Sequence, residues 1–259
     1  MNDGRGMNGQ RVWLTGATSG IGEALVEPLV RRGARVAITA RRAGLLDVIA
    51  ARHARGGSSP VLSVAADVTD RDAVHAAAAQ IEAAWGGIDL AIFNAGGSVG
   101  DRTRFRGDDC AATMTLNYFS VVYGIDAVLP GMLARGHGRI AAVASLAGYR
   151  AMPAATAYGA SKAAVIHLLD GLRFELAPRG VGVTVINPGF VRTPLTAPNA
   201  FRMPFVMEAD EAAERIVRGL ERGKKEIHFP ARLSWTMKVL RILPYGLYEQ
   251  LMKRAGKRK

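Results

Sequence analysis

The sequence contains a single cysteine, Cys110, among 259 residues. One cysteine cannot form a disulfide within the chain, which excludes the disulfide-stabilised secreted domains. No apolar run approaches the roughly 18 residues needed to span a bilayer, so no transmembrane helix is predicted. The opening residues MNDGRGMNGQ also lack the apolar core of a signal peptide. A reducing cytoplasm is therefore the expected location.

The sequence also has little histidine, and no histidine spacing is typical of metal ligands, so no metal site is expected. Acidic residues are in the minority, with 22 Asp and Glu against 34 Lys and Arg, a net charge of +12. Such a charge can attract nucleic acid, a membrane surface or a phosphorylated cofactor. Because no nucleic-acid-binding motif accompanies it, nucleic acid is not expected as a partner.

Positive charge is concentrated in residues 231–259, the C-terminal extension. Eight Lys and Arg against one Glu give it +7 of the total +12. Apolar residues recur at helical spacing on both sides of Pro244, which predicts two short amphipathic helices. We expect them to cap a cleft of the main domain or to pack against a second subunit; contact with an anionic membrane is the alternative. Four apolar residues would then face the lipid: Trp235, Leu240, Leu243 and Leu247.

Apolar segments alternate with segments of helical periodicity throughout residues 1–230. Buried strands are predicted at 11–15, 35–40, 61–66, 88–97, 139–145, 182–189 and 226–230. Helices are predicted at 23–33, 43–55, 70–87, 109–134, 156–177 and 209–222. This alternation predicts an α/β fold, a doubly wound parallel sheet of Rossmann type in one domain, followed by the C-terminal extension.

A glycine-rich turn, TGATSGIG at residues 15–22, follows the first predicted strand. Gly16, Gly20 and Gly22 would let backbone N–H groups approach a pyrophosphate, and the N-terminus of the next helix adds partial positive charge. In this strand-to-helix context the turn indicates a dinucleotide site. The alternative is that the glycines only make a tight turn.

The stretch AYGASKAAV, residues 157–165, places Tyr158 and Lys162 four positions apart. In a helix both side chains lie on one face. A tyrosine with its usual pKa near 10 exchanges protons poorly at neutral pH, but an adjacent cation stabilises the phenolate and lowers that pKa. The pair therefore suggests proton transfer, and an ordinary surface pair on a helix is the alternative.

Together with other motifs, these features resemble the short-chain dehydrogenase/reductase family over residues 11 to about 230. The motifs follow the family's order: TGATSGIG, Asp67 with Val68, NAG at 94–96, Asn117, Ser145, Tyr158 with Lys162, and PGFVRT at 188–193. One departure is Phe93, where many members have asparagine; the NAG turn itself is intact.

The resemblance implies that four residues are catalytic. Tyr158 would exchange a proton with the oxygen of a carbonyl or alcohol, and Ser145 would hydrogen-bond the same oxygen. Lys162 would also hold the nicotinamide ribose, and Asn117 would anchor a water that relays protons to the lysine.

The resemblance also implies a cofactor site. Its expected residues are Gly16, Thr18, Ser19, Gly20, Ile21, Gly22, Arg41, Arg42, Asp67, Val68, Asn94, Ala95, Gly96, Tyr158, Lys162, Pro188, Gly189, Val191 and Thr193. An acid at the end of the second strand would accept the adenosine ribose 2′-hydroxyl, whereas arginine favours a 2′-phosphate. The sequence there is TARR, ending in Arg41 and Arg42. NADP(H) is therefore preferred over NAD(H).

Residues 190–207 lie where the family has a lid over the active site. They offer six apolar side chains: Phe190, Leu195, Phe201, Met203, Phe205 and Met207. Tyr149 and Met152 could belong to the same wall, which suits a small apolar ketone or secondary alcohol. Packing of these residues against the body or another subunit is the alternative.

The expected function is that of an NADP(H)-dependent carbonyl reductase or alcohol dehydrogenase, assembled as a dimer or tetramer as in the family. Two other functions are considered. A dinucleotide-sensing regulatory or scaffold protein would not need all four catalytic residues. A hydrolase built on Ser145 is disfavoured because AVASLAG is not G-x-S-x-G and no histidine is placed by sequence to be its base.

Overall fold

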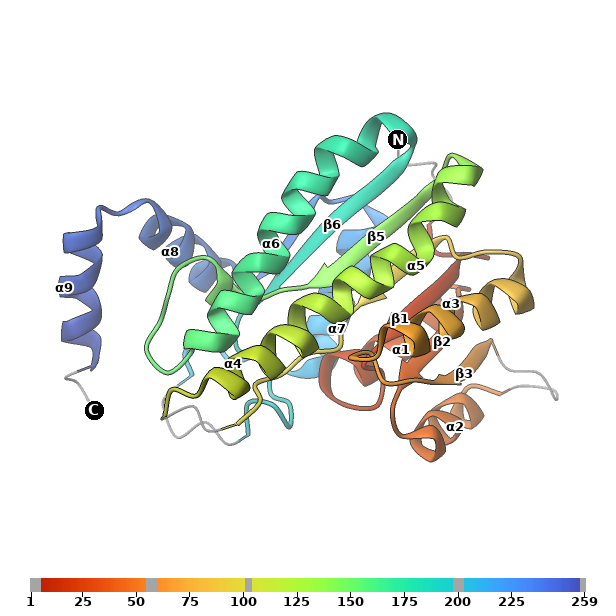
Figure 1. Ribbon diagram of the computed structural model, residues 1–259, viewed down its shortest axis with the longest axis horizontal. Coiled ribbons are helices and arrows are strands. Elements are labelled where there is room, and N and C mark those ends of the chain that lie inside the picture. Colours follow the sequence, from red (N-terminus) through yellow and green to blue (C-terminus); the bar gives the residue numbers. More distant parts are fainter. Residues whose placement is uncertain (1–5, 55–59, 101–103, 198–202, 257–259) are drawn as a thin grey trace.

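The computed structural model describes residues 6–54, 60–100, 104–197 and 203–256. Within them the chain forms one parallel sheet with the strand order β3-β2-β1-β4-β5-β6-β7 (Figure 1). This confirms the predicted doubly wound α/β fold. The strands are β1 (Arg11–Thr15), β2 (Arg35–Ala40), β3 (Val61–Ala65), β4 (Leu90–Phe93), β5 (Gly138–Val143), β6 (Val181–Pro188) and β7 (Glu226–Phe229).

Helices cover both faces of the sheet, as strands with continuous apolar sequence require. One layer holds α1 (Gly20–Arg31), α2 (Ala43–Arg52) and α7 (Ala209–Glu221). The other holds α3 (Arg71–Trp85), α5 (Ser120–Arg135) and α6 (Thr156–Leu176), with α4 (Gly107–Met114) leading into α5 (Figure 1).

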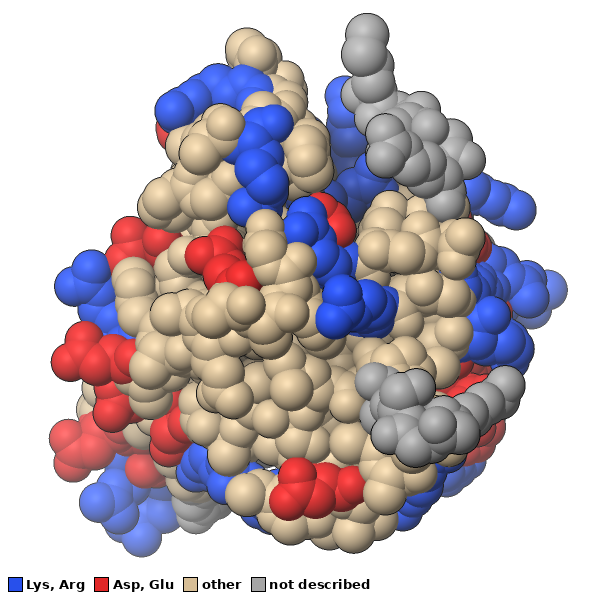
Figure 2. Space-filling model, turned by 90° about the vertical axis from the view of Figure 1, so that its right-hand side faces the viewer, with Lys and Arg blue, Asp and Glu red and all other residues tan. Residues whose placement is uncertain are grey.

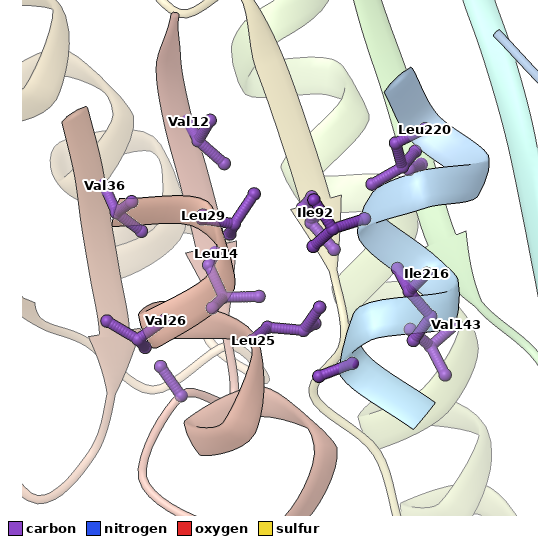
Figure 3. Packing of buried hydrophobic residues seen from close by; sticks show 14 of the residues in the cluster. Val12, Leu14, Leu25, Val26, Leu29, Val36, Ile92, Val143, Ile216 and Leu220 are labelled. Atoms are coloured by element: carbon purple, nitrogen blue, oxygen red, sulfur yellow. The ribbon is translucent and has the colours of Figure 1, made fainter. Parts of the chain in front are cut away.

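The hydrophobic core consists of two clusters, one on each face of the sheet. In β1, Val12 and Leu14 face the layer of α1 and α7, while Trp13 faces the opposite layer. This alternation follows the two-residue period of a strand. Figure 3 shows part of the first cluster, with Leu25 of α1 and Ile216 of α7 on the same side of the sheet. The two clusters fix the sheet between its helices and so position the strand ends.

A π-helix, Thr115–Phe119, interrupts the long helix predicted at 109–134 and joins α4 to α5. The whole helix, Gly107–Arg135, is long and apolar enough to cross a membrane by length and composition alone. The sequence had predicted no transmembrane helix. The helix packs against α3, α6 and the sheet, which accounts for its apolar side, so the finding is weak support for a membrane span.

The C-terminal extension forms two helices on either side of Pro244, as predicted: α8 (Ala231–Ile242) and α9 (Tyr245–Gly256). They lie at one end of the molecule, where α9 stands away from the sheet and its covering helices (Figure 1). On α8, Met237 is buried against the core, and on α9, Tyr248 is buried. Lys257, Arg258 and Lys259 of the extension lie outside the described residues.

Charge on the opposite end of the molecule is mixed. Figure 2 shows both acidic and basic side chains on that face, among large neutral areas. The surface also has exposed ion pairs, for example between Arg71 and Asp126. Surface pairs of this kind contribute little to stability, so the fold depends on the two apolar clusters.

Candidate active site

The carboxyl ends of strands β1 to β6 surround a cavity of about 1130 Å³. This is where ligands bind to doubly wound sheets. The predicted catalytic and cofactor residues line it with two exceptions, Gly22 and Asn117. Those that line it are Gly16, Thr18, Ser19, Gly20, Ile21, Arg41, Arg42, Asp67, Val68, Asn94, Ala95, Gly96, Ser145, Tyr158, Lys162, Pro188, Gly189, Val191 and Thr193. Residues that are far apart in the sequence are therefore brought to one cavity.

The glycine-rich turn lies between β1 and α1. Gly16 has a φ of +69°, and a Cβ there would lie 2.7 Å from Ala95 Cα, so the position requires glycine. Ser19 precedes α1 but makes no capping hydrogen bond with its side chain. The first N–H groups of α1 therefore have no side-chain partner from Ser19 and remain available to an anion.

Gly22 is not a lining residue, contrary to its expected place among the cofactor contacts. A Cβ on Gly22 would lie 2.1 Å from the backbone oxygen of Gly16 and 2.5 Å from Asn94 Nδ2. This glycine lets α1 pack directly on the turn. Gly22 therefore helps to fix the backbone of the glycine-rich turn without facing the cavity.

Two arginines follow β2 at one end of the cavity, and both are exposed. Arg42 Nη2 donates to Thr18 Oγ1 at 2.9 Å, which holds its guanidinium beside the glycine-rich turn. Asp67 follows β3, the strand next to β2, and accepts hydrogen bonds from the backbone N–H and the hydroxyl of Thr69. Burial raises the pKa of Asp67, but the Thr69 bonds and the charge of Arg41 outweigh it and hold that pKa below its ordinary value.

Thr69 also lines the cavity and was missed by the sequence analysis. Its position two residues after Asp67, just before a helix, is typical of an Asx-turn, and this pattern could have identified it.

Tyr158 and Lys162 lie one turn apart on α6, and Lys162 Nζ is 5.8 Å from the centroid of the tyrosine ring. The lysine is buried, and its Nζ donates to the backbone oxygen of Val143 at 2.8 Å. Burial lowers the pKa of Lys162 to about 8. An ammonium is therefore held beneath the phenol and retains its charge at neutral pH.

Ser145 follows β5 at the cavity wall. Its Oγ accepts from Ala147 N at 3.1 Å, and its nearest acceptor here, the Pro188 oxygen, is 3.5 Å away. Because that donated bond is long, the hydroxyl can turn its proton toward a ligand oxygen. In the described part of the chain no histidine hydrogen-bonds to Ser145, so the Ser–His pair of a typical serine hydrolase is not formed there.

Asn117 is buried in the π-helix, behind the cavity wall. Its Nδ2 donates to Gly97 O at 2.8 Å and to Ser161 Oγ at 2.9 Å, and its Oδ1 accepts from Gly97 N at 2.8 Å. The side chain therefore ties the loop after β4 to α6. Both amide hydrogens are committed, so an anchored water would have to donate to an oxygen of Asn117, and this role stays a prediction.

The apolar wall differs in part from the prediction. Leu195 lines the cavity, whereas Met207 is buried in the core, where it pairs with Val191 in a β-bridge. Tyr149 points away from the cavity, since its buried hydroxyl donates to Glu226. Burial, followed by the Glu226 contact, raises the pKa of this tyrosine.

Among the other predicted lid residues, Phe205 is exposed and Phe201 lies outside the described residues. Leu116 and Val99 also line the cavity and were not predicted to do so. In the described part of the chain no group of His, Cys, Asp and Glu is arranged to hold a metal ion.

The burial of Lys162 predicts a pH-dependent stability. Its pKa of about 8 in the folded protein lies below the unfolded value near 10.5, so between these pH values the unfolded chain binds more protons. The free energy of unfolding of the native protein should therefore rise between pH 8 and 10.5 relative to that of Lys162→Met. The rise should be roughly 3 kcal/mol at about 1.36 kcal/mol per pKa unit.

Urea unfolding of both proteins at about pH 7 and about pH 10 measures this difference, because all other titrating groups are shared. A stability difference that does not change with pH would mean that the ammonium is not buried.

Two adjacent glycines offer a matched test of the same wall. A Cβ on Gly96 would lie 2.7 Å from Asn117 Oδ1 and 2.9 Å from Lys162 Nζ, whereas on Gly97 the nearest atom is 3.6 Å away. Gly96→Ala should therefore destabilise the fold by about 1–3 kcal/mol through overpacking and lower kcat, while Gly97→Ala should resemble the native protein. Thermal unfolding and turnover are measured for both variants. If Gly96→Ala and Gly97→Ala were equally stable and equally active, the close contact described at Gly96 would be contradicted.

Sequence comparisons agree with this geometry. A family model described as short chain dehydrogenase matches residues 10–202. An uncharacterized oxidoreductase of Myxococcus xanthus is 37% identical over 242 residues, covering 93% of this chain and 95% of the relative. A fatty acyl-CoA reductase of Mycobacterium tuberculosis is 37% identical over 216 residues, covering 82% and 73%.

Solved structures share the fold. A short chain dehydrogenase from Burkholderia cenocepacia in complex with NADP has a TM-score of 0.80 and 28% identity, covering 95% of this chain and 99% of that one. A short chain dehydrogenase/reductase from Burkholderia phymatum in complex with NAD has a TM-score of 0.80 at 23% identity, covering 90% and 92%, a likeness of fold alone. The family match and the shared fold together show that this chain is an oxidoreductase of the short-chain dehydrogenase family.

Proposed function

We propose that the protein is an NADP(H)-dependent carbonyl reductase, reversible as an alcohol dehydrogenase, that acts on lipophilic ketones and secondary alcohols. The observation that carries this proposal is the buried ammonium of Lys162 beside Tyr158, on a cavity that also contains the glycine-rich turn. A nicotinamide cofactor, which the family uses, supplies the hydride.

The residues present fit such a cofactor. Ser19 leaves the first N–H groups of α1 without a side-chain cap, which suits a pyrophosphate. Arg41 and Arg42 line the same cavity after β2 and suit a 2′-phosphate. These two arginines are the basis for preferring NADP(H) over NAD(H).

Tyr158 would transfer the proton. The positive charge of Lys162 would stabilise the phenolate that remains when Tyr158 gives up its proton. The hydroxyl of Ser145 can turn its proton toward the same oxygen, which stabilises the charge that develops there. Tyr158 and Ser145 are therefore proposed as catalytic residues, and Lys162 as the residue that tunes the phenol and holds the cofactor ribose.

Three apolar side chains lie in the part of the cavity that is proposed for the substrate. Val99, Leu116 and Leu195 line it, which favours a lipophilic carbonyl compound over a charged one. The similarity to a fatty acyl-CoA reductase is in keeping with such a substrate. The test is NADPH consumption against a panel that runs from small ketones to long-chain oxo-acyl and steroid compounds. Turnover should rise with apolar size; the absence of turnover with every member would contradict the proposal.

A second copy of the chain is the proposed protein partner. Phe119 and Phe174 are exposed on the long central helices, and Phe174 of α6 is 79% exposed. Burial of these rings between two copies would remove apolar surface from water. Light scattering should therefore give the molar mass of a dimer or tetramer, and a monomeric mass would contradict this assembly.

A further inference from the structure

The segment that joins Ser145 to α6, residues 146–155, is held mainly by other parts of the molecule. It contains one short 3-10 helix, Leu146–Gly148, and Ala154 has a φ of +58°. A left-handed conformation is unfavourable for alanine and persists only where the surroundings impose it. Ser145 precedes this connecting segment and Tyr158 follows it within α6, so a displacement of the segment can change the distance between the two hydroxyls.

The first support reaches Tyr149 from α8. The Tyr149 hydroxyl donates to Glu226 Oε1, and Lys238 Nζ of α8 donates to Glu226 Oε2 at 2.7 Å. Asn187 Nδ2 donates to the same tyrosine oxygen at 3.2 Å. Burial raises the pKa of Glu226, but the bonds from Lys238 and Tyr149 outweigh it and keep that pKa below its ordinary value. The carboxylate thus stays charged and links the segment to the extension.

The next two residues are held by α8 and α9. Arg150 Nη1 donates to the backbone oxygen of Arg241 at 2.9 Å, and its guanidinium carbon lies 4.4 Å from the centroid of the Tyr248 ring. The Tyr248 hydroxyl donates to the backbone oxygen of Ala151. Three consecutive residues of the connecting segment are therefore tied, directly or through Glu226, to the C-terminal extension.

We propose that the C-terminal extension is a clamp that positions Ser145 and Tyr158, with Lys238 and Tyr248 as its positioning residues. This inference rests on the proposed function, because it concerns the two hydroxyls that act on one substrate oxygen. A displacement of about 1 Å at such a site can cost about a hundredfold in rate. The clamp gives the basic extension a role in turnover, although it lies outside the cavity.

The test uses Lys238→Met and Tyr248→Phe, each of which removes one bond and keeps the apolar part of the side chain. Lys253→Met is the matched control, because Lys253 is exposed on α9 and pairs with Glu249 of the same helix. Each clamp variant should lower kcat by about tenfold with an unchanged Kd for NADPH. The control should keep native values of both.

Hydrogen exchange provides a readout that does not depend on activity. Backbone amides of residues 146–155 should exchange faster in Lys238→Met and Tyr248→Phe than in the native protein and in Lys253→Met. Unchanged exchange in both clamp variants would overturn the clamp even if the protein reduces ketones. If the native protein showed no turnover, the proposed function would be contradicted. Faster hydrogen exchange in the two variants would still show that the extension holds residues 146–155 in place.

A different observation concerns the outer face of the extension. Trp235, Val239 and Ile242 lie on one face of α8 at helical spacing, with Trp235 61% and Ile242 80% exposed. Leu247 and Leu251 of α9 are also exposed. Leu240, by contrast, packs on the core, so the packing and membrane interpretations apply to opposite sides of the same helix.

The net charge of the C-terminal extension indicates what kind of surface covers its outer face. The extension carries +7, so two extensions brought together would repel each other, whereas an anionic lipid surface is complementary. We infer that the outer face of α8 and α9 rests on the surface of an anionic membrane, with its apolar residues in the interfacial layer. This would place the cavity near a source of lipophilic substrate.

Flotation with phosphatidylcholine vesicles, with and without phosphatidylglycerol, tests this inference. The native protein should float only with the anionic vesicles, and a double variant, Trp235→Ser with Ile242→Ser, should not float. Val48→Ser is the control, because Val48 is exposed on α2, outside both the extension and the proposed contact between copies. Equal flotation of the native protein and the double variant would overturn the inference. The inference would also be overturned if the native protein did not float and the double variant had a lower molar mass than the native protein. That result would indicate that a second copy of the chain covers this face.

Discussion

Tyr158→Phe should lower kcat for ketone reduction by about a hundredfold or more while leaving the Kd for NADPH nearly unchanged. The phenol is the proposed proton donor, and phenylalanine keeps the ring beside Lys162 but has no proton to give. Stopped-flow turnover gives the first quantity, and quenching of protein fluorescence by NADPH gives the second. The loss should be confined to the chemical step.

A suitable control is Tyr123→Phe, which removes a phenol from an aromatic stack on α5 away from the cavity. Its turnover should be native. Turnover by Tyr158→Phe within a few-fold of native would remove this tyrosine from the mechanism. If the native protein bound NADPH but reduced no compound, the dinucleotide-sensing alternative would account better for the site.

Arg41→Asp should reverse the cofactor preference. The arginine lines the cavity at the end of β2, where a charge-assisted hydrogen bond to a 2′-phosphate would be worth about 1.5–3 kcal/mol. The new carboxylate would repel that phosphate and could accept a ribose 2′-hydroxyl instead. The ratio of kcat/KM for NADPH to that for NADH should therefore fall by at least about tenfold.

Arg179→Asp serves as the control for net charge, because Arg179 is exposed at the far end of α6, before β6 begins. It should leave the cofactor ratio as in the native protein. A ratio that also stays unchanged in Arg41→Asp would mean that the 2′-phosphate is not bound by this arginine.

The sheet could be predicted because strands buried on both faces must be apolar throughout. Strand β1 illustrates this. All three of its central residues are buried, although Trp13 faces one layer of helices and Val12 and Leu14 face the other. The π-helix at Thr115–Phe119 was not predicted, because one wider turn hardly changes the apolar periodicity of a long helix.

The orientation of single side chains was harder to predict than their neighbourhood. Tyr149 was expected near the cavity because it lies between Ser145 and Tyr158 in the sequence. Its hydroxyl instead points to Glu226, 77 residues away, and that partner is known only once β7 is placed beside β6. Gly22 was placed correctly at the turn, but its packing on Gly16 depends on how closely α1 approaches.

The proposed function requires that a hydride pass from a nicotinamide ring to a carbonyl carbon and that Tyr158 supply the proton. The most direct test is mass spectrometry of the alcohol formed from an accepted ketone and NADPH deuterated at C4, with each stereoisomer of the label used separately. One of the two should give an alcohol with deuterium on the carbinol carbon, and Tyr158→Phe should give almost none. NADPH oxidation without deuterium in the product from either stereoisomer would contradict the account.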